Sequence, residues 1–361
     1  MSNISRLRPC AAAICLLLGA FAWLASGCAS RPAGAPGPGG VKAPAGGTAA
    51  PPGPAWPEPT LPAAVRVRVS STSGSRVLSL PLEDYVLGAV RAEVLPSTLR
   101  ARPASAALDV QAIVSRTYAS ANAGRHASDG YDLCDATHCQ VYRPPAAGEG
   151  PGDAAARAVE ATRGRILTFR GRAIQALFHA DCGGRTASAA SVWGGTDAPY
   201  LASAEDWYCA GRPEGNWTFT VEARGLLQAL NADPRTRIGD RLARVDIALR
   251  DAAGRALAVT LAGSTAVSIR AEVFRAVVMQ AFGPRSIRSN WFEISRDGAR
   301  FRFAGVGFGH GVGLCQGGTV RRAEARQTPV EILSHYFPGT LVQAARTGPA
   351  RPDIAGRLFS R

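Results

Sequence analysis

The sequence lacks an apolar run long enough to cross a membrane, and it almost lacks lysine. A transmembrane helix needs about 20 apolar residues, whereas the run near the N-terminus, Cys10 to Ala25, is shorter. Lys42 is the only lysine among 361 residues, so arginine carries nearly all of the formal net charge of +14. Because no RNP, helix-turn-helix, zinc-finger or His-Glu-x-x-His pattern is present, nucleic-acid binding and a zinc hydrolase of that type are disfavoured.

The first residues have the layout of an export signal. Two arginines precede the apolar run, and small residues ending in Cys28 follow it, which is typical of a secretory signal. The segment resembles a bacterial lipobox with its leucine, Leu24, one place early. We therefore expect residues 1–28 to be a lipoprotein-type signal with lipidation at Cys28; an ordinary signal peptide with an incidental cysteine is the alternative. The protein would be exported to the cell envelope and anchored to the membrane by lipid, facing the periplasm or wall.

A linker is expected after the signal. Residues 29–62 are almost all Pro, Gly, Ala and Ser, and such a segment buries too little apolar surface to offset its ordering entropy. The whole chain is 46% apolar, and the roughly 300 residues after the linker are enough for a packed core. Its basic charge favours an anionic partner, and export leaves wall polymer or lipid rather than nucleic acid.

The pattern of apolar residues predicts a mixture of strands and helices without regular βαβ alternation, which favours an α+β fold. Strands are predicted at 65–69, 77–80, 165–170, 173–179, 245–249, 257–261, 292–294 and 301–303, and helices at 82–94, 104–123, 271–282, after 305–318, and at 329–336.

Glu93 is the first candidate for catalysis. It lies at the C-terminal end of the predicted helix 82–94, among apolar neighbours. The helix dipole and partial desolvation both raise the pKa of a carboxyl in this position. A carboxyl protonated near neutral pH is what general-acid cleavage of a glycosidic bond requires. The alternative is a structural glutamate paired with Arg91 or Arg116.

Two glycine-rich segments carry further polar residues. They cover residues 178–195 and 307–318 and contain His179 and His310. Glycines allow a backbone to approach a ligand closely, and no Lys-Ser/Thr follows to form a phosphate loop. We interpret these segments as walls of a saccharide cleft, where Trp193 could stack on a sugar ring; a core tryptophan is the alternative.

A cysteine-histidine cluster suggests a metal. Cys134 and Cys139 are separated by four residues and His126 precedes them. Two thiolates and an imidazole suit zinc, with His138 as a possible substitute for His126. A Cys134–Cys139 disulfide is the alternative, because an exported protein lies in an oxidising compartment. We also expect a disulfide between Cys182 and Cys209.

Several of these segments together resemble one known family. The resemblance covers residues 65 to 341 and points to the stage II sporulation protein D (SpoIID/LytB) family. It rests on Tyr85 to Pro96 with Ala92-Glu93, Ser115 to Ala119, His179 to Thr186, Val192-Trp193-Gly194, Gly309 to Gly313, and Ile332 to Thr340.

The resemblance implies an architecture: an α+β core with a smaller inserted region and a long substrate cleft. The domain would cover residues 63–345, with the inserted or second subdomain at about 217–290 and a tail at 346–361. Cys315 departs from some relatives, in which serine is common at that place.

The resemblance also implies a function. Members of the family are lytic transglycosylases that act on peptidoglycan glycan strands, particularly strands stripped of peptides, or are non-catalytic enhancers of N-acetylmuramoyl-L-alanine amidases. Glu93 would be the single catalytic acid and base, and His126, Cys134 and Cys139 would bind zinc nearby. The expected substrate-binding residues are Arg116, Tyr118, His179, Gly183, Gly184, Trp193, His310 and Gln316.

Overall fold

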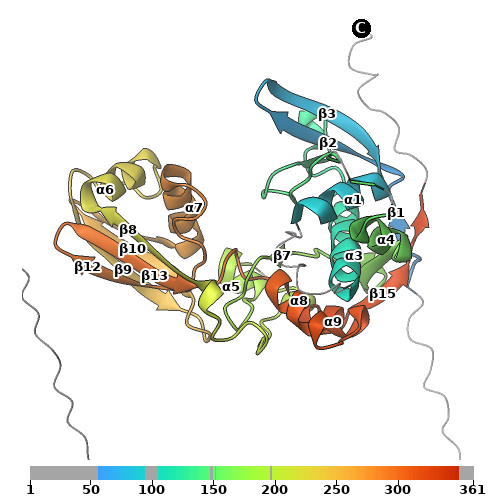
Figure 1. The fold of residues 1–361 in the computed structure, drawn as a ribbon. Helices are drawn as coiled ribbons and strands as arrows, with labels where there is room; N and C mark the ends of the chain where they lie inside the picture. The colour runs from blue at the N-terminus through green and yellow to red at the C-terminus, as the bar shows by residue number, and fades with distance from the viewer. Residues whose placement is uncertain (1–55, 94–104, 147–148, 151, 196, 349–361) are drawn as a thin grey trace, which may run out of the picture. The chain divides into compact units, whose positions relative to one another are not determined.

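The structure, a computed structural model, describes residues 56–93, 105–146, 149–150, 152–195 and 197–348. They belong to one compact unit, residues 54–361. The predicted signal with Cys28 and most of the predicted linker lie outside the described residues. The mixed arrangement of helices and strands in several small sheets confirms the α+β class (Figure 1).

The chain enters the fold through a hairpin. Strands β2 (Ala64–Ser71) and β3 (Gly74–Pro81) pair antiparallel, and β4 (Leu133–Cys134) adds to β2 in parallel. Val65 and Val67 are fully buried because the alternating pattern turns both toward the same face. The pairing of β4 with β2 thereby places Cys134 beside the hairpin.

Helix α1 (Leu82–Glu93) follows the hairpin and packs on α3 (Ser105–Ala121) and α4 (Ala154–Ala161). A close approach explains Gly88: a methyl group there would collide with the ring of Tyr142, which stacks on Tyr85 with ring centroids 5.4 Å apart. The stretch before residue 143 is therefore packed directly against α1, which ends at Glu93.

A second core lies around the central segments. Strands β15 (Leu341–Ala344), β5 (Arg165–Phe169) and β6 (Arg172–Ala173) form one sheet in that order. The strand predicted at 173–179 is divided, because β6 pairs with β5 whereas β7 (Phe178–His179) pairs in parallel with β14 (Leu314–Cys315). Helices α8 (Gln316–Glu324) and α9 (Pro329–Tyr336) follow β14, and a capping box at Thr328 begins α9.

A third core is built from the segment between β8 and β13. It contains two three-stranded sheets, ordered β11-β10-β9 and β12-β13-β8. It includes Phe301 and Phe303, so this core extends beyond residue 290, where we placed the end of the inserted region. Its elements are β8 (Asn216–Glu222), α6 (Ala223–Ala232), β9 (Leu242–Arg250), β10 (Ala256–Gly263), β11 (Ala266–Arg270), α7 (Ala271–Phe282), β12 (Phe292–Asp297) and β13 (Arg300–Val306).

The two ends of the described chain meet in one small sheet. Strand β1 (Thr60–Leu61) pairs in parallel with β16 (Arg346–Thr347). The folded part therefore begins before residue 63 and continues past 345, because Leu61 is buried against the first core. Among the residues described, none of the helices combines the length and apolar character needed to cross a membrane.

Candidate functional site

Glu93 is held at the end of α1 by a hydrogen bond from a distant loop. The backbone N–H of Val141 donates to Glu93 Oε1 at 2.7 Å. Val141 follows the cysteine-histidine segment and precedes Tyr142, the ring that packs on Gly88. The Glu93 carboxyl therefore has a defined position although it ends a helix.

A second contact joins Glu93 to the C-terminal glycine-rich segment. The side chain of Gln316, the first residue of α8, lies close enough to the Glu93 carboxyl to lower its pKa. Gln316 Nε2 also donates to Gln111 Oε1 at 3.3 Å, and Gln111 in turn donates to Ser115. One of the predicted substrate-binding residues thus lies directly beside the predicted catalytic acid.

Burial raises the pKa of Glu93 to about 7, while the hydrogen bond from Val141 and the polar side chain of Gln316 act in the opposite direction. Desolvation exceeds both because it disfavours the charged carboxylate. The direction agrees with our prediction from the sequence. Near neutral pH, Glu93 therefore exists in both the protonated and the ionised form.

The alternative role for Glu93, as the partner of a nearby arginine, is not what the structure shows. Arg91 pairs with Asp153 at 2.6 Å and approaches Glu149 at 3.8 Å. Arg116 pairs with Glu83. Within the described residues, both arginines thus have other carboxylates, and no ion pair involves Glu93.

Arg116 and Tyr118 are buried in the core instead of facing a cleft. The Arg116 guanidinium is fully buried and binds both oxygens of Glu83, at 2.6 and 2.9 Å, as well as the carbonyls of Val159 and Arg165. Tyr118 is 3% exposed, and burial raises its pKa to about 12. Contact of these two residues with substrate stays a prediction, and α3 places both side chains in packed surroundings.

His179, His310 and Trp193 form a separate aromatic group. The ring centroid of His310 lies 5.6 Å from that of His179 and 5.2 Å from that of Trp193. Trp193, at the end of α5 (Ala189–Trp193), is 38% exposed, so it is not a core tryptophan. Burial lowers the pKa of His310 to about 4 and that of His179 well below its usual value, so both imidazoles are neutral. No interaction between this group and Glu93 occurs among the described residues.

Gly183 and Gly184 shape a loop near a different group of side chains. Both have positive φ, 73° and 118°, a conformation that glycine adopts readily. The Gly184 N–H donates to the sulfur of Cys182 at 3.4 Å. The Gly183 N–H donates to Asp181 Oδ1 at 2.7 Å, so these glycines direct backbone groups toward a carboxylate and a thiol rather than toward Glu93.

The cysteine-histidine segment brings four ligand atoms together. His126, Cys134, His138 and Cys139 each supply one atom, and these atoms lie within 4.8 Å of one another. His126 Nε2 is 3.3 Å from Cys139 Sγ, and His138 Nδ1 is 3.9 and 3.8 Å from the two sulfurs. Ligands of one tetrahedral zinc ion at usual bond lengths are separated by about 3.5 Å. The residues present therefore fit zinc, with both histidines included rather than one as a substitute for the other.

The structure has free thiols at Cys134, Cys139, Cys182, Cys209 and Cys315. The disulfide that we expected between Cys182 and Cys209 is not formed. Cys209 Sγ instead lies 3.3 Å from Cys315 Sγ, with Cys182 in the same group. The prediction omitted Cys315 because β14 brings it to this place only in the folded chain.

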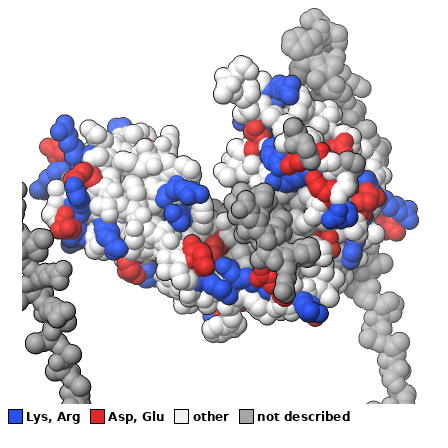
Figure 2. All heavy atoms as spheres, viewed as in Figure 1, with Lys and Arg blue, Asp and Glu red and all other residues white. Residues whose placement is uncertain are grey.

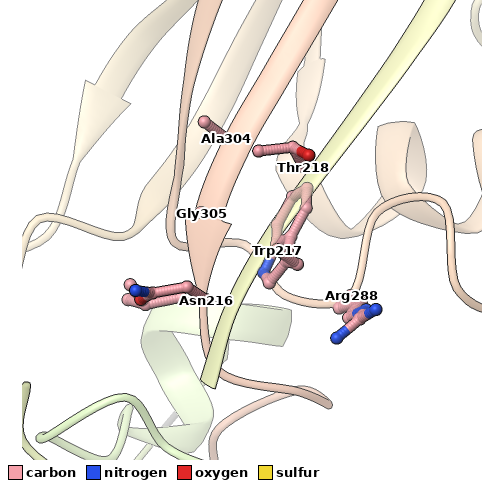
Figure 3. A pocket seen from close by; sticks show the side chains of 7 residues that line it. Asn216, Trp217, Thr218, Arg288, Ala304 and Gly305 are labelled. Carbon is pink, nitrogen blue, oxygen red and sulfur yellow. The ribbon is translucent and has the colours of Figure 1, made fainter. Parts of the chain in front are cut away.

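A hollow of about 610 Å³ lies elsewhere, along β8 and β13 (Figure 3). Its lining includes Trp217 and Arg288 but no carboxylate, histidine or thiol, so it offers no acid-base chemistry. On the face shown in Figure 2, arginines alternate with acidic side chains and do not form one large basic patch.

Comparison with known proteins gives the family. A family profile described as stage II sporulation protein, SpoIID, matches residues 70–169. Stage II sporulation protein D of Bacillus amyloliquefaciens is 30% identical over 304 residues, which cover 80% of this chain and 82% of that protein. The chain belongs to the stage II sporulation protein D family. The protein of the same name from Bacillus subtilis is 28% identical over 78% of this chain and 80% of its own length, and an amidase enhancer of that organism is 25% identical over 68% of this chain and 39% of its own length.

The stretch matched by the SpoIID profile contains Glu93 and the four possible metal ligands. Sequence reasoning missed two residues beside them, Val141 and Gln111. Val141 acts through its backbone, so its side chain carries no signal. Gln111 lies on a buried helical face, where a lone glutamine is unusual. A polar residue within that apolar stretch was the one feature of the sequence that could have identified it as part of the site.

Proposed function

We propose that this chain cleaves peptidoglycan glycan strands as a lytic transglycosylase, with Glu93 as its single general acid and base. The observation that carries the proposal is the half-buried Glu93 carboxyl, which pairs with no arginine among the described residues and has a pKa of about 7. Membership of the SpoIID family supports a role in the cell wall. The preferred substrate would be glycan stripped of its peptides.

The reaction needs one carboxyl used twice. Protonated Glu93 gives its proton to the bridging oxygen as the bond from that oxygen to the muramyl C1 breaks. The C6 hydroxyl oxygen of the same sugar then bonds to C1, and its proton returns to the Glu93 carboxylate. The product is a 1,6-anhydro-muramyl end, and no water is consumed, so the paired second carboxylate of an ordinary glycosidase is not required.

The surroundings of Glu93 suit both halves of this cycle. A pKa near the working pH makes a group effective as acid and as base. The Val141 N–H, 2.7 Å from Oε1, fixes one oxygen, so the other is the one that we assign to proton transfer. Glu83 is engaged by Arg116 and Asp84 is exposed, so neither should take part in the chemistry.

We assign zinc to His126, Cys134, His138 and Cys139. A set of four protein ligands is typical of structural zinc, whereas catalytic zinc keeps an open position. Zinc bound there would stabilise the local structure and would take no direct part in the reaction. The loop that it would stabilise is the one that contains Val141, so these four residues would indirectly position Glu93.

The test of the catalytic proposal is product analysis on peptide-free glycan. Wild type should release anhydro-muramyl ends without incorporating oxygen from ¹⁸O-labelled water, and Glu93→Gln should release none. Glu324→Gln, the same substitution at an exposed position at the end of α8, is the matched control and should remain active. Absence of anhydro products with wild type, or activity retained by Glu93→Gln, would contradict the proposal.

Enhancement of a wall amidase is the second candidate, favoured by the similarity to a protein named amidase enhancer. It requires no chemistry at Glu93. Stimulation of an N-acetylmuramoyl-L-alanine amidase that persists in Glu93→Gln, from protein that releases no anhydro ends, would support this function instead. Loss of the stimulation in Glu93→Gln would count against it.

The proposal includes location in the envelope through a lipid on Cys28. The basic chain, with a net charge of +14, would then meet anionic wall polymer. Labelling with a radioactive fatty acid should mark wild type and not Cys28→Ser. Unlabelled wild type recovered from the membrane fraction would exclude the lipid anchor.

A further inference from the structure

A group of three thiols and one carboxylate lies in the second core, apart from the four ligands considered above. Cys182 follows β7, Asp206 and Cys209 lie in one loop, and Cys315 ends β14. One atom from each lies within 4.8 Å of every other. All four residues are at most 1% exposed. We propose that Cys182, Cys209, Cys315 and Asp206 bind a zinc ion.

The spacing of the ligand atoms suits a single tetrahedral ion. Cys209 Sγ and Cys315 Sγ are 3.3 Å apart, and Cys182 Sγ is 3.4 Å from Asp206 Oδ2. At usual zinc bond lengths, two sulfurs of one tetrahedral ion are separated by about 3.8 Å, and a sulfur and an oxygen by about 3.5 Å. A small outward movement of the sulfurs admits the ion.

Each sulfur receives hydrogen bonds from N–H groups. The N–H groups of Cys182 and Gly318 donate to Cys315 Sγ at 3.2 and 3.3 Å, the Gly184 N–H donates to Cys182 Sγ at 3.4 Å, and Arg321 Nη1 donates to Cys209 Sγ at 3.4 Å. A neutral thiol is a weak acceptor. Donors directed at all three sulfurs are what thiolate ligands require around a metal.

Asp206 is oriented in the same way. The Tyr336 hydroxyl donates to Asp206 Oδ2 at 2.6 Å, and Arg322 Nη2 donates to Asp206 Oδ1 at 3.3 Å. The position next to Asp206 has to be a glycine, Gly318, because a methyl group there would collide with both Asp206 Oδ2 and the Tyr336 hydroxyl. Ligating carboxylates are commonly fixed by such outer hydrogen bonds.

The charges also balance with a divalent cation. Three thiolates and a carboxylate carry four negative charges, which could not all remain buried without compensation. Arg321 and Arg322 contact the group, and the opposite charges of Arg255 and Asp181 also act on it. Together these side chains contribute a net two positive charges, and a zinc ion supplies the other two. A disulfide between any two of the sulfurs would instead leave the third thiol and its N–H donors without a role.

This site would tie three distant segments together at the start of α8. Gln316 follows Cys315 directly and contacts Glu93, so the ion would fix the position of that contact. The inference does not depend on the proposed glycan cleavage, because its test measures metal rather than activity.

The test uses full-length chain purified without chelator, with zinc measured by mass spectrometry. The double variant Cys134→Ser/Cys139→Ser removes the thiolates of the first ligand set and should retain one zinc per chain. Introducing Cys209→Ser into this double variant should remove the remaining zinc ion, and circular dichroism shows whether the triple variant is still folded. Asp206→Asn, which keeps the hydrogen-bond acceptor for Tyr336, should lower the zinc affinity of the double variant by about tenfold or more.

Cobalt substitution gives a second readout. Cobalt added to the metal-free double variant should produce the thiolate-to-cobalt charge-transfer band, and Cys209→Ser should weaken it. Even if the double variant fails to fold, Cys209→Ser alone should lower the zinc content of wild type by one per chain. A folded double variant that binds neither zinc nor cobalt, or peptide mapping that finds a disulfide among the three cysteines, would overturn the proposal.

Discussion

The raised pKa of Glu93 predicts how the stability of the protein depends on pH. Glu93→Gln replaces the carboxyl with a neutral group of the same shape that still accepts the hydrogen bond from Val141. Below pH 4.5, Glu93 is protonated in both the folded and the unfolded state, so the pH-dependent difference between the two proteins should be absent. As the pH rises from 4.5 to about 7, the unfolded chain loses this proton while the folded chain retains it. Wild type should therefore lose stability relative to Glu93→Gln over this window, and the difference should stay constant at higher pH.

The size of this change in stability follows from the rise in the pKa of Glu93. One pKa unit corresponds to about 1.36 kcal/mol, so the rise from 4.5 to about 7 corresponds to about 3 kcal/mol. The Glu93 side chain is half-buried, and partial exposure to solvent screens part of this. We expect Glu93→Gln to gain about 2 to 3 kcal/mol over wild type between pH 4.5 and pH 8.

The assay is urea unfolding of both proteins at several pH values, read by circular dichroism. Glu324→Gln controls for the loss of one negative charge at an exposed position. A difference between wild type and Glu93→Gln that does not change with pH, or one that favours wild type increasingly as the pH rises, would refute the conclusion that burial governs this carboxyl. The same titration should appear in catalysis as a fall in glycan cleavage above about pH 7, because the protonated acid becomes scarce.

Three further results are expected. Arg116→Met should lower the free energy of unfolding by about 2 to 4 kcal/mol, since it leaves the partly buried Glu83 carboxylate unpaired. Arg346→Met, at an exposed ion pair, should cost under about 1 kcal/mol, and equal costs in urea unfolding would contradict this. Gly318→Ala should cost about 1 to 3 kcal/mol by overpacking, because its methyl group meets Asp206, and an unchanged melting temperature would argue against that packing. Cys134→Ser should abolish zinc at the first ligand set and increase proteolysis of the loop before residue 143; unchanged metal content would exclude this set.

Local pattern was enough to place the elements that carry Glu93 and its neighbours. The alternation in β2 and the helical spacing in α1 depend on a few consecutive residues, so the sequence predicted both of them. Glu93 at the end of α1 and the raised pKa of its carboxyl followed from the same local reasoning. The short paired strands β6 and β7 were not separable, because each is defined by a partner far along the chain.

Partners of polar side chains were decided by the tertiary structure. Arg116 could have paired with Glu93 by sequence reasoning, yet packing of α1 on α3 gives it Glu83. β14 pairs with β7, and α8 follows β14 directly. This pairing is what places Gln316 beside Glu93 and Cys315 beside Cys182 and Cys209. The sequence by itself determined the elements, the position of the acid and the presence of ligand-forming cysteines, since these depend on neighbouring residues; which side chains meet depends on long-range packing, which no local pattern encodes.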